Sequence, residues 1–156
     1  MPIRRPLRLL FCVLALGYVI GLSAADPVPN TLEEAFVVLD QKLTSEAREQ
    51  FRRTLEEEAV TSAHMSLGMY IRNQWFRAGG SRLPGLLQDV GARHMDDMSS
   101  IVLTSYWRHL NGKPLQLAQQ GECYRRWWQE QERLVREAKS NGEPSYATPS
   151  FSCPQG

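Results

Sequence analysis

Apolar residues recur with helical spacing along most of this 156-residue chain, from residue 31 to about residue 139. The spacing predicts six helices, over residues 31–43, 44–58, 62–76, 83–90, 96–110 and 114–139. No stretch of four or more residues alternates cleanly between apolar and polar, so no β-sheet is expected. The pattern therefore predicts one irregular all-α domain of five or six helices, residues 31–140, with an extended tail over residues 141–156.

The helix boundaries carry their own signals. Thr31 and Glu34 have the spacing of a capping box, in which hydroxyl and carboxylate accept bonds from free backbone N–H groups. Asp96 or Asp97 is expected to cap the helix that ends at Leu110. The helix over residues 62–76 is apolar around most of its girth, which predicts a central position in the domain.

The first 25 residues contain, in sequence, the three regions typical of a secretory signal peptide. Arg4, Arg5 and Arg8 precede an uncharged apolar run, residues 9–22, and the small residues Ser23 to Ala25 follow. The run is shorter than the roughly 20 residues of a spanning helix. We therefore expect cleavage after Ala25, a linker over residues 26–30, and a periplasmic or secreted protein with no membrane span after cleavage. An uncleaved N-terminal anchor is the alternative.

Charge and composition exclude some partners. The signal segment contains three of the 18 basic residues and none of the 17 acidic ones, so the mature part is nearly neutral. A nearly neutral domain is not typical of nucleic-acid binding, which depends on a basic surface. The sequence contains no phosphate-binding loop and no Cys or His spacing typical of a zinc site, so neither a cofactor nor a metal is expected.

Two cysteines, Cys123 and Cys153, remain after the signal segment. An even number of cysteines in an exported domain favours a disulfide. A bond between them would hold the tail against the last helix. Two free thiols are the alternative.

Glycines and residues with polar, charged or aromatic side chains that could form a site are concentrated in three segments: Gly68 to Trp75, Gly79 to Ser81, and His94 to Ser99. These segments resemble a bacterial family known as domain of unknown function 6794, whose members carry G-M-x-I-R-N-x-W, a Gly-Gly-Ser turn and H-P-D-D-[MI]-S. The resemblance extends from about Pro29 to Trp128, and Met95 stands where the family usually has Pro. It implies a helical, often exported domain, and it implies no activity.

Arg72 is the most informative residue of this region, because it lies in a helix that is otherwise apolar. A partly buried Arg needs a carboxylate or several carbonyl groups as partners, and Asp96 or Asp97 is the candidate carboxylate. One interpretation is a structural ion pair. The other is a ligand or partner surface formed by Arg72, Asn73, Trp75, His94, Asp96 and Asp97.

The sequence favours a non-enzymatic binding protein over an enzyme. No nucleophile elbow surrounds Ser81 or Ser99, and no metal spacing surrounds His64 or His94. We expect the partner to be another envelope or secreted protein, as for an immunity or inhibitor protein. The alternative is an envelope hydrolase-like enzyme that uses Arg72, His94 and Asp97. The four tryptophans are expected to pack in the core; the alternative is that one of them, Trp128 or Trp75, lies in a groove or partner face.

Overall fold

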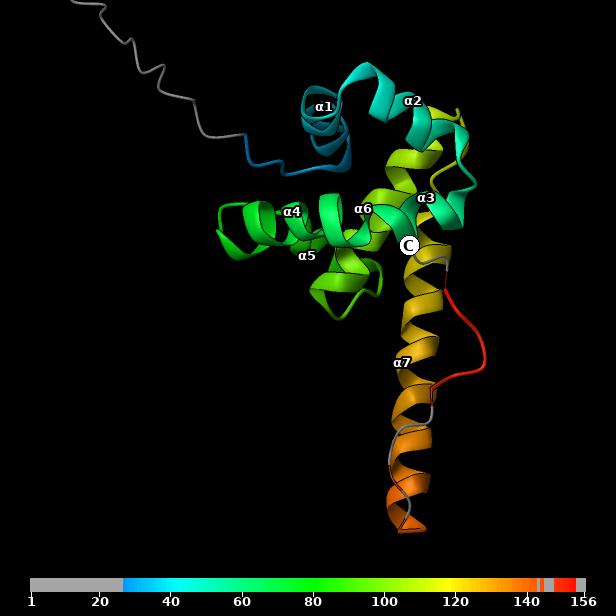
Figure 1. Ribbon diagram of the computed structural model, residues 1–156. Coiled ribbons are helices and arrows are strands. Elements are labelled where there is room, and N and C mark those ends of the chain that lie inside the picture. The colour runs from blue at the N-terminus through cyan, green and yellow to red at the C-terminus, as the bar shows by residue number, and fades with distance from the viewer. Residues whose placement is uncertain (1–26, 143, 145–147, 154–156) are drawn as a thin grey trace, which may run out of the picture.

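The computed structural model describes residues 27–142, 144 and 148–153. This part of the chain is helical and contains no strand (Figure 1). The helices are α1 (Leu32–Lys42), α2 (Ser45–Arg53), α3 (Glu56–Ala63), η1 (His64–Gly68), α4 (Met69–Ile71), η2 (Arg72–Arg77), α5 (Leu83–Val90), α6 (Met95–Leu110) and α7 (Leu117–Ser140). Because α3, η1, α4 and η2 follow without a break, they form one continuous helix, and the expected all-α domain of six helices is confirmed. The expected signal peptide and the first linker residue lie outside the described residues.

The central helix is α6, whereas the sequence predicted the helix over residues 62–76. Residues 97–107 of α6 are all buried, and four of them are serine or threonine. Small hydroxyl side chains let neighbouring helices approach from every side, and Ser99 Oγ donates to Asp96 O at 3.0 Å within its own helix. A helix with these residues looks half polar in the sequence although it is buried on all faces.

The continuous helix begins at Glu56, six residues before the predicted start, and it is amphipathic. Thr54, with an extended backbone, and the non-helical Leu55 separate α2 from this helix. Three glutamates then occupy its first turn, where negative charge interacts favourably with the helix dipole. Met65 and Met69 are 69% and 45% exposed. The helix over residues 62–76 has apolar side chains on most of its faces, but some of them are exposed. Its apolar character therefore did not predict a central position correctly.

At two helix starts, the residues that form the cap differ from the predicted ones. The Thr31 hydroxyl accepts from Glu34 N at 3.2 Å as predicted, but the Glu34 carboxylate accepts from Asn30 N at 2.7 Å, one residue earlier. The cap residue of α6 is His94, whereas an aspartate was expected. Asp97 lies three residues later, where its carboxylate reaches back to the free N–H groups before the helix.

Helix α7 begins at Leu117 because Gln116 has a left-handed backbone, with φ of 54°, which no continuous helix from Pro114 could contain. The first turns of α7 pack on the end of α5, and the second half projects away from the other helices (Figure 1). At the contact, a Cβ on Gly121 would lie 1.7 Å from Val90 O, so the two backbones touch. None of the helices in the described part is long and apolar enough to cross a lipid bilayer.

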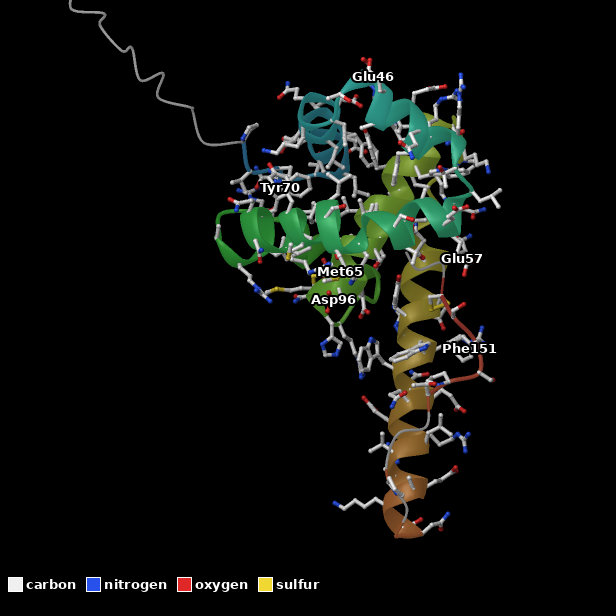
Figure 2. All side chains as sticks on the ribbon, in the orientation of Figure 1. Glu46, Glu57, Met65, Tyr70, Asp96 and Phe151 are labelled. Carbon is white, nitrogen blue, oxygen red and sulfur yellow. A yellow bond between two sulfur atoms is a disulfide. The ribbon has the colours of Figure 1, made fainter. Side chains whose placement is uncertain are left out.

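The predicted disulfide between Cys123 and Cys153 is present, with the two Cα atoms 5.5 Å apart. It holds the end of the tail against α7, and Cys153 is 2% exposed. Figure 2 shows Phe151 beside α7, where the Arg126 guanidinium lies 5.5 Å from the ring centroid. Residues 148–153 thus lie beside α7 and are joined to it by the disulfide at Cys153.

Candidate functional site

The adjacent residues Asp96 and Asp97 connect α6 to two different parts of the molecule. Asp96 is mostly exposed, and its carboxylate turns toward the continuous helix (Figure 2). Asp97 is 8% exposed, and its carboxylate turns toward α7. Successive side chains of a helix point about 100° apart, so the first turn of α6 contacts the continuous helix through Asp96 and α7 through Asp97.

Arg72 lies at the centre of the first cluster. Its side chain is 10% exposed, and its Nε lies 3.1 Å from Asp96 Oδ1. The other nitrogens donate to Ser99 Oγ at 2.9 Å and to His64 O at 3.4 Å. The expected ion pair is therefore present, with Asp96 as the partner. Gly68 leaves room for it, because a Cβ there would lie 3.0 Å from Arg72 Nη1.

His64 joins this cluster from the π-helical segment η1. Its Nε2 lies 3.6 Å from Asp96 Oδ1, so a protonated imidazole would share this carboxylate with Arg72. Its Nδ1 is buried and has no hydrogen-bond partner within the described residues. The cluster is an ion-pair network that locks the continuous helix to the first turn of α6.

The second cluster is built around the Asp97 carboxylate. Oδ2 accepts from Trp128 Nε1 at 2.8 Å, from His94 N at 3.1 Å and from Arg93 N at 3.3 Å. The His94 ring packs on the Trp128 ring with centroids 4.1 Å apart. Asp97 therefore fixes the start of α6 and anchors an aromatic pair on α7.

Two of the six candidate residues do not reach either cluster. Trp75 is 1% exposed, and its ring packs edge-on against Tyr70 with centroids 5.7 Å apart, so it belongs to the core. Asn73 accepts a bond from Arg77 Nη1 at 3.3 Å along its own helix. The six residues thus do not form one common surface: Arg72, Trp75 and Asp97 are buried, and only His94 and Asp96 are largely exposed.

His94, the exposed residue of the second cluster, lines a surface pocket of about 580 Å³ beside α7. We call it the His94–Trp128 pocket. Most of the surface exposed in it is apolar, although five of its seven lining residues are polar or charged. The lining consists of Arg93, His94, Trp128, Gln131, Glu132, Val135 and Arg136. Arg93 and Glu132 form an ion pair across it. Trp128 and Val135 lie two helical turns apart on one face of α7, and this spacing is a signal by which the sequence could have indicated the pocket.

Other chemistry has little structural support in the described part of the chain. No group of three or more His, Cys, Asp or Glu side chains gathers there in an arrangement that could hold a metal ion. Arg72 and Asp97 are already engaged by the partners given above, in two separate clusters. A shared catalytic pocket of Arg72, His94 and Asp97 is therefore not what this geometry forms.

Comparison with known proteins finds no match among curated proteins and none among solved structures. A family model matches residues 28–110. The match ends with the last residue of α6, short of the expected Trp128, so the disulfide and the whole of α7 lie beyond it. The matched segment covers more than half of the sequence, and the chain therefore belongs to the family described as domain of unknown function DUF6794.

Proposed function

We propose that this chain is an exported, non-enzymatic binding protein that docks a partner on the His94–Trp128 pocket. The observation that carries the proposal is the open, largely apolar pocket built around a half-buried Trp. Trp and Arg residues dominate the energetics of protein interfaces, and this pocket contains one Trp and two Arg. The His94 ring and the Asp97 carboxylate hold Trp128 in place before any partner arrives.

Binding fits the geometry better than catalysis. The hydrolase-like alternative needs Arg72, His94 and Asp97 to converge on one substrate. Arg72 is satisfied by Asp96 and Ser99, whereas Asp97 is satisfied by backbone N–H groups and an indole. Their partners orient Arg72 and Asp97 into two separate clusters, so the two side chains do not converge on one substrate position.

The partner is another envelope or secreted protein, because the sequence predicts a signal peptide at residues 1–25. An inhibitor or immunity protein is one form of such a function. The pocket requires an apolar side chain of the partner, and the exposed Arg136 favours an acidic residue beside it.

The test is affinity capture from an envelope extract with the mature chain, followed by quantification of the captured protein against two variants. Val135→Glu places a charge in the pocket without touching the core, and it should reduce capture at least ten-fold. Leu86→Glu is the matched control, since Leu86 is a 49% exposed residue of α5 and does not line the pocket. Equal loss of capture in both variants, or none in Val135→Glu, would remove this pocket from the interface.

A further inference from the structure

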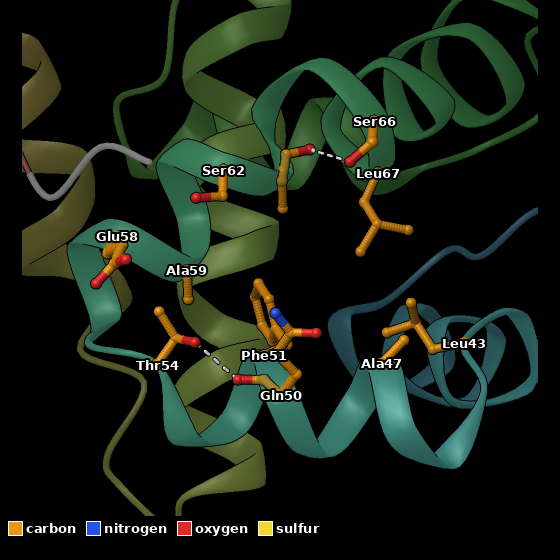
Figure 3. A pocket seen from close by; sticks show the side chains of 11 residues that line it. Leu43, Ala47, Gln50, Phe51, Thr54, Glu58, Ala59, Ser62, Ser66 and Leu67 are labelled. Carbon is orange, nitrogen blue, oxygen red and sulfur yellow. Dashed lines mark hydrogen bonds between the residues drawn. The ribbon is translucent and has the colours of Figure 1, made fainter.

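A second hollow lies within the family segment, between α2 and the continuous helix. We call it the α2–α3 groove; its volume is about 490 Å³. In Figure 3, the two helices face each other across the opening. Its lining consists of Leu43, Ala47, Gln50, Phe51, Thr54, Glu58, Ala59, Ser62, Ala63, Ser66 and Leu67. Six of these residues are apolar, four are polar and uncharged, and Glu58 is the single charged residue.

We propose that the α2–α3 groove binds a small amphiphilic molecule that has an apolar body and one protonated amine. Phe51, Ala59 and Ala63 are buried at its apolar base and suit the body of such a molecule. The exposed carboxylate of Glu58 forms no ion pair within the described residues, and it supplies the charge that an ammonium group complements. The proposal does not depend on the His94–Trp128 pocket.

Polar groups suited to a ligand lie along the same opening. The side chains of Gln50 and Ser62 form no hydrogen bond within the part of the chain described. By contrast, Thr54 Oγ1 donates to Gln50 O at 2.8 Å and Ser66 Oγ donates to Ala63 O at 3.2 Å, which leaves their lone pairs to accept (Figure 3). Apolar contact with a few polar groups placed at the edge is typical of small-molecule sites.

The dimensions of the groove favour a small molecule over a partner helix. Helix α2 has nine residues and is therefore about 13 Å long at 1.5 Å per residue. An amphipathic helix bound in a groove places its anchors at positions i to i+7, which span about 12 Å, so α2 is barely long enough to form a wall along the anchors alone. The volume of the groove is compatible with a small molecule, since ligand pockets measure about 300–1,000 Å³.

The groove is held open by contacts behind it. Trp107 Nε1 donates to Thr54 O at 2.9 Å, and Asn111 Nδ2 donates to Arg52 O at 3.1 Å. Arg108 pairs with Glu56 at 2.7 Å, so α6 fixes both sides of the bend between α2 and α3. A site that is already formed loses less free energy to ordering when a ligand binds.

The wall of the groove contains the π-helical segment η1, His64–Gly68. Such wide turns are rare and occur frequently at functional sites. Two residues of η1, Ser66 and Leu67, line the groove, whereas His64 of the same segment faces Asp96. The widened turn thus presents side chains to the groove while the ion-pair network holds the other side of the helix.

Three probes with the same apolar body test the proposal on the mature chain. These are 1-naphthylmethylamine, 1-naphthylmethanol and 1-naphthoic acid, which are cationic, neutral and anionic at neutral pH. Binding is followed by NMR through the methyl resonances of Ala47, Ala59, Ala63, Leu43 and Leu67. We expect shifts confined to these methyls, with the amine binding most tightly and the acid most weakly.

Two variants assign the site. Glu58→Gln should weaken the amine about two- to five-fold, as expected for an exposed charge pair, and leave the alcohol unchanged. Glu57→Gln is the matched control, because Glu57 is exposed on the same turn and does not line the groove. Ser62→Phe should fill the opening and remove binding of all three probes while the melting temperature stays the same.

Three outcomes would overturn the proposal. The first is no shift of the groove methyls with any probe at millimolar concentration. The second is equal affinity for all three probes that Glu58→Gln does not change. The third is binding that survives Ser62→Phe in a folded protein.

Discussion

The indole Nε1 of Trp128 donates to Asp97 Oδ2 at 2.8 Å, and this bond joins the projecting helix α7 to the first turn of α6. The same oxygen accepts from the backbone N–H groups of Arg93 and His94. One carboxylate therefore performs two tasks: it caps the central helix and fixes the Trp that lines the proposed partner pocket.

Removing this carboxylate should destabilise the fold. We expect Asp97→Ala to lower the free energy of unfolding by about 2 kcal/mol, because three donors lose their shared acceptor. Asp89→Ala is the control: Asp89 is exposed on α5, and its replacement should change stability by less than about 0.5 kcal/mol. Urea denaturation measures both, and the indole N–H resonance of Trp128 should move only in Asp97→Ala. Equal stability of the two variants would contradict the bridging role of Asp97.

The Arg72–Asp96 pair predicts a non-additive double mutant. Arg72→Ala should cost about 3 kcal/mol, because it removes a buried side chain with three partners. Asp96→Ala leaves Arg72 with neutral acceptors only, yet the Asp96 side chain is 66% exposed, so its cost should be about 1 kcal/mol. The double mutant should cost less than the sum, since it leaves no unpaired charge.

The control for this cycle is the adjacent carboxylate. Asp97→Ala combined with Arg72→Ala should be close to additive, because Asp97 belongs to the other cluster. Coupling of Arg72 to Asp97 with no coupling to Asp96 would show that the two aspartates exchange roles in solution.

Several features of the fold could be predicted from the sequence because they depend on local spacing. The Thr31 cap and the helix over residues 83–90 follow from residues close together in the sequence. The disulfide followed from an even number of cysteines in a predicted exported chain. The ion pair of Arg72 followed from the free energy of a buried charge, which requires a counter-charge somewhere nearby.

Other features depend on tertiary contacts that a periodic pattern does not contain. The central position of α6 was missed because Ser99, Ser100, Thr104 and Ser105 look polar, although all four are buried. Trp75 was also a candidate for the ligand or partner surface, and it is enclosed by the core. The α2–α3 groove was missed because it forms between two helices that diverge, and neither helix alone carries a sign of it.

Replacement by alanine should have opposite effects at two glycines, one at the contact between α7 and α5 and one on the open side of α5. Gly121→Ala should destabilise by about 3 kcal/mol or more, because the new methyl would lie 1.7 Å from Val90 O and would force the helices apart. Gly85→Ala should stabilise by about 0.5–1 kcal/mol, because Gly85 lies within α5 with open space around the added methyl. Thermal unfolding monitored by circular dichroism measures both. A tolerated Gly121→Ala would mean that α7 does not pack this closely.

Reduction of the disulfide should loosen the tail more than the helical body. The closed loop, with a sequence separation of 30, corresponds to about 3–4 kcal/mol in the chain-entropy model. Reduction also frees residues 148–153 in the folded state, which contact the rest mainly through Phe151 and Cys153. We therefore expect a loss smaller than the chain-entropy value. Urea denaturation with and without reductant measures it, and protease cleavage within the tail should appear only after reduction.

Tyr106 and Tyr124 predict a loss of stability at alkaline pH. Burial raises the pKa of the Tyr106 phenol well above its ordinary value of 10.0, and the bond that its O–H donates to Asp40 raises it further. Burial likewise raises the pKa of Tyr124. Both folded-state values exceed the unfolded value, so the folded protein retains two protons that the unfolded chain releases above about pH 10.

Because the folded-state pKa values are raised, these tyrosines contribute their full stabilisation below the unfolded pKa. The contribution falls as the pH rises beyond about 10. The free energy of unfolding should decrease by up to about 1.4 kcal/mol per pH unit for each tyrosine in that window. Urea denaturation at a series of pH values measures the slope, and Tyr106→Phe should reduce it by about half. In the folded protein, the phenolate absorbance of both residues should remain absent until the chain unfolds. Phenolate absorbance that develops for both residues near pH 10 without unfolding would show that neither phenol is held in its neutral form by the core.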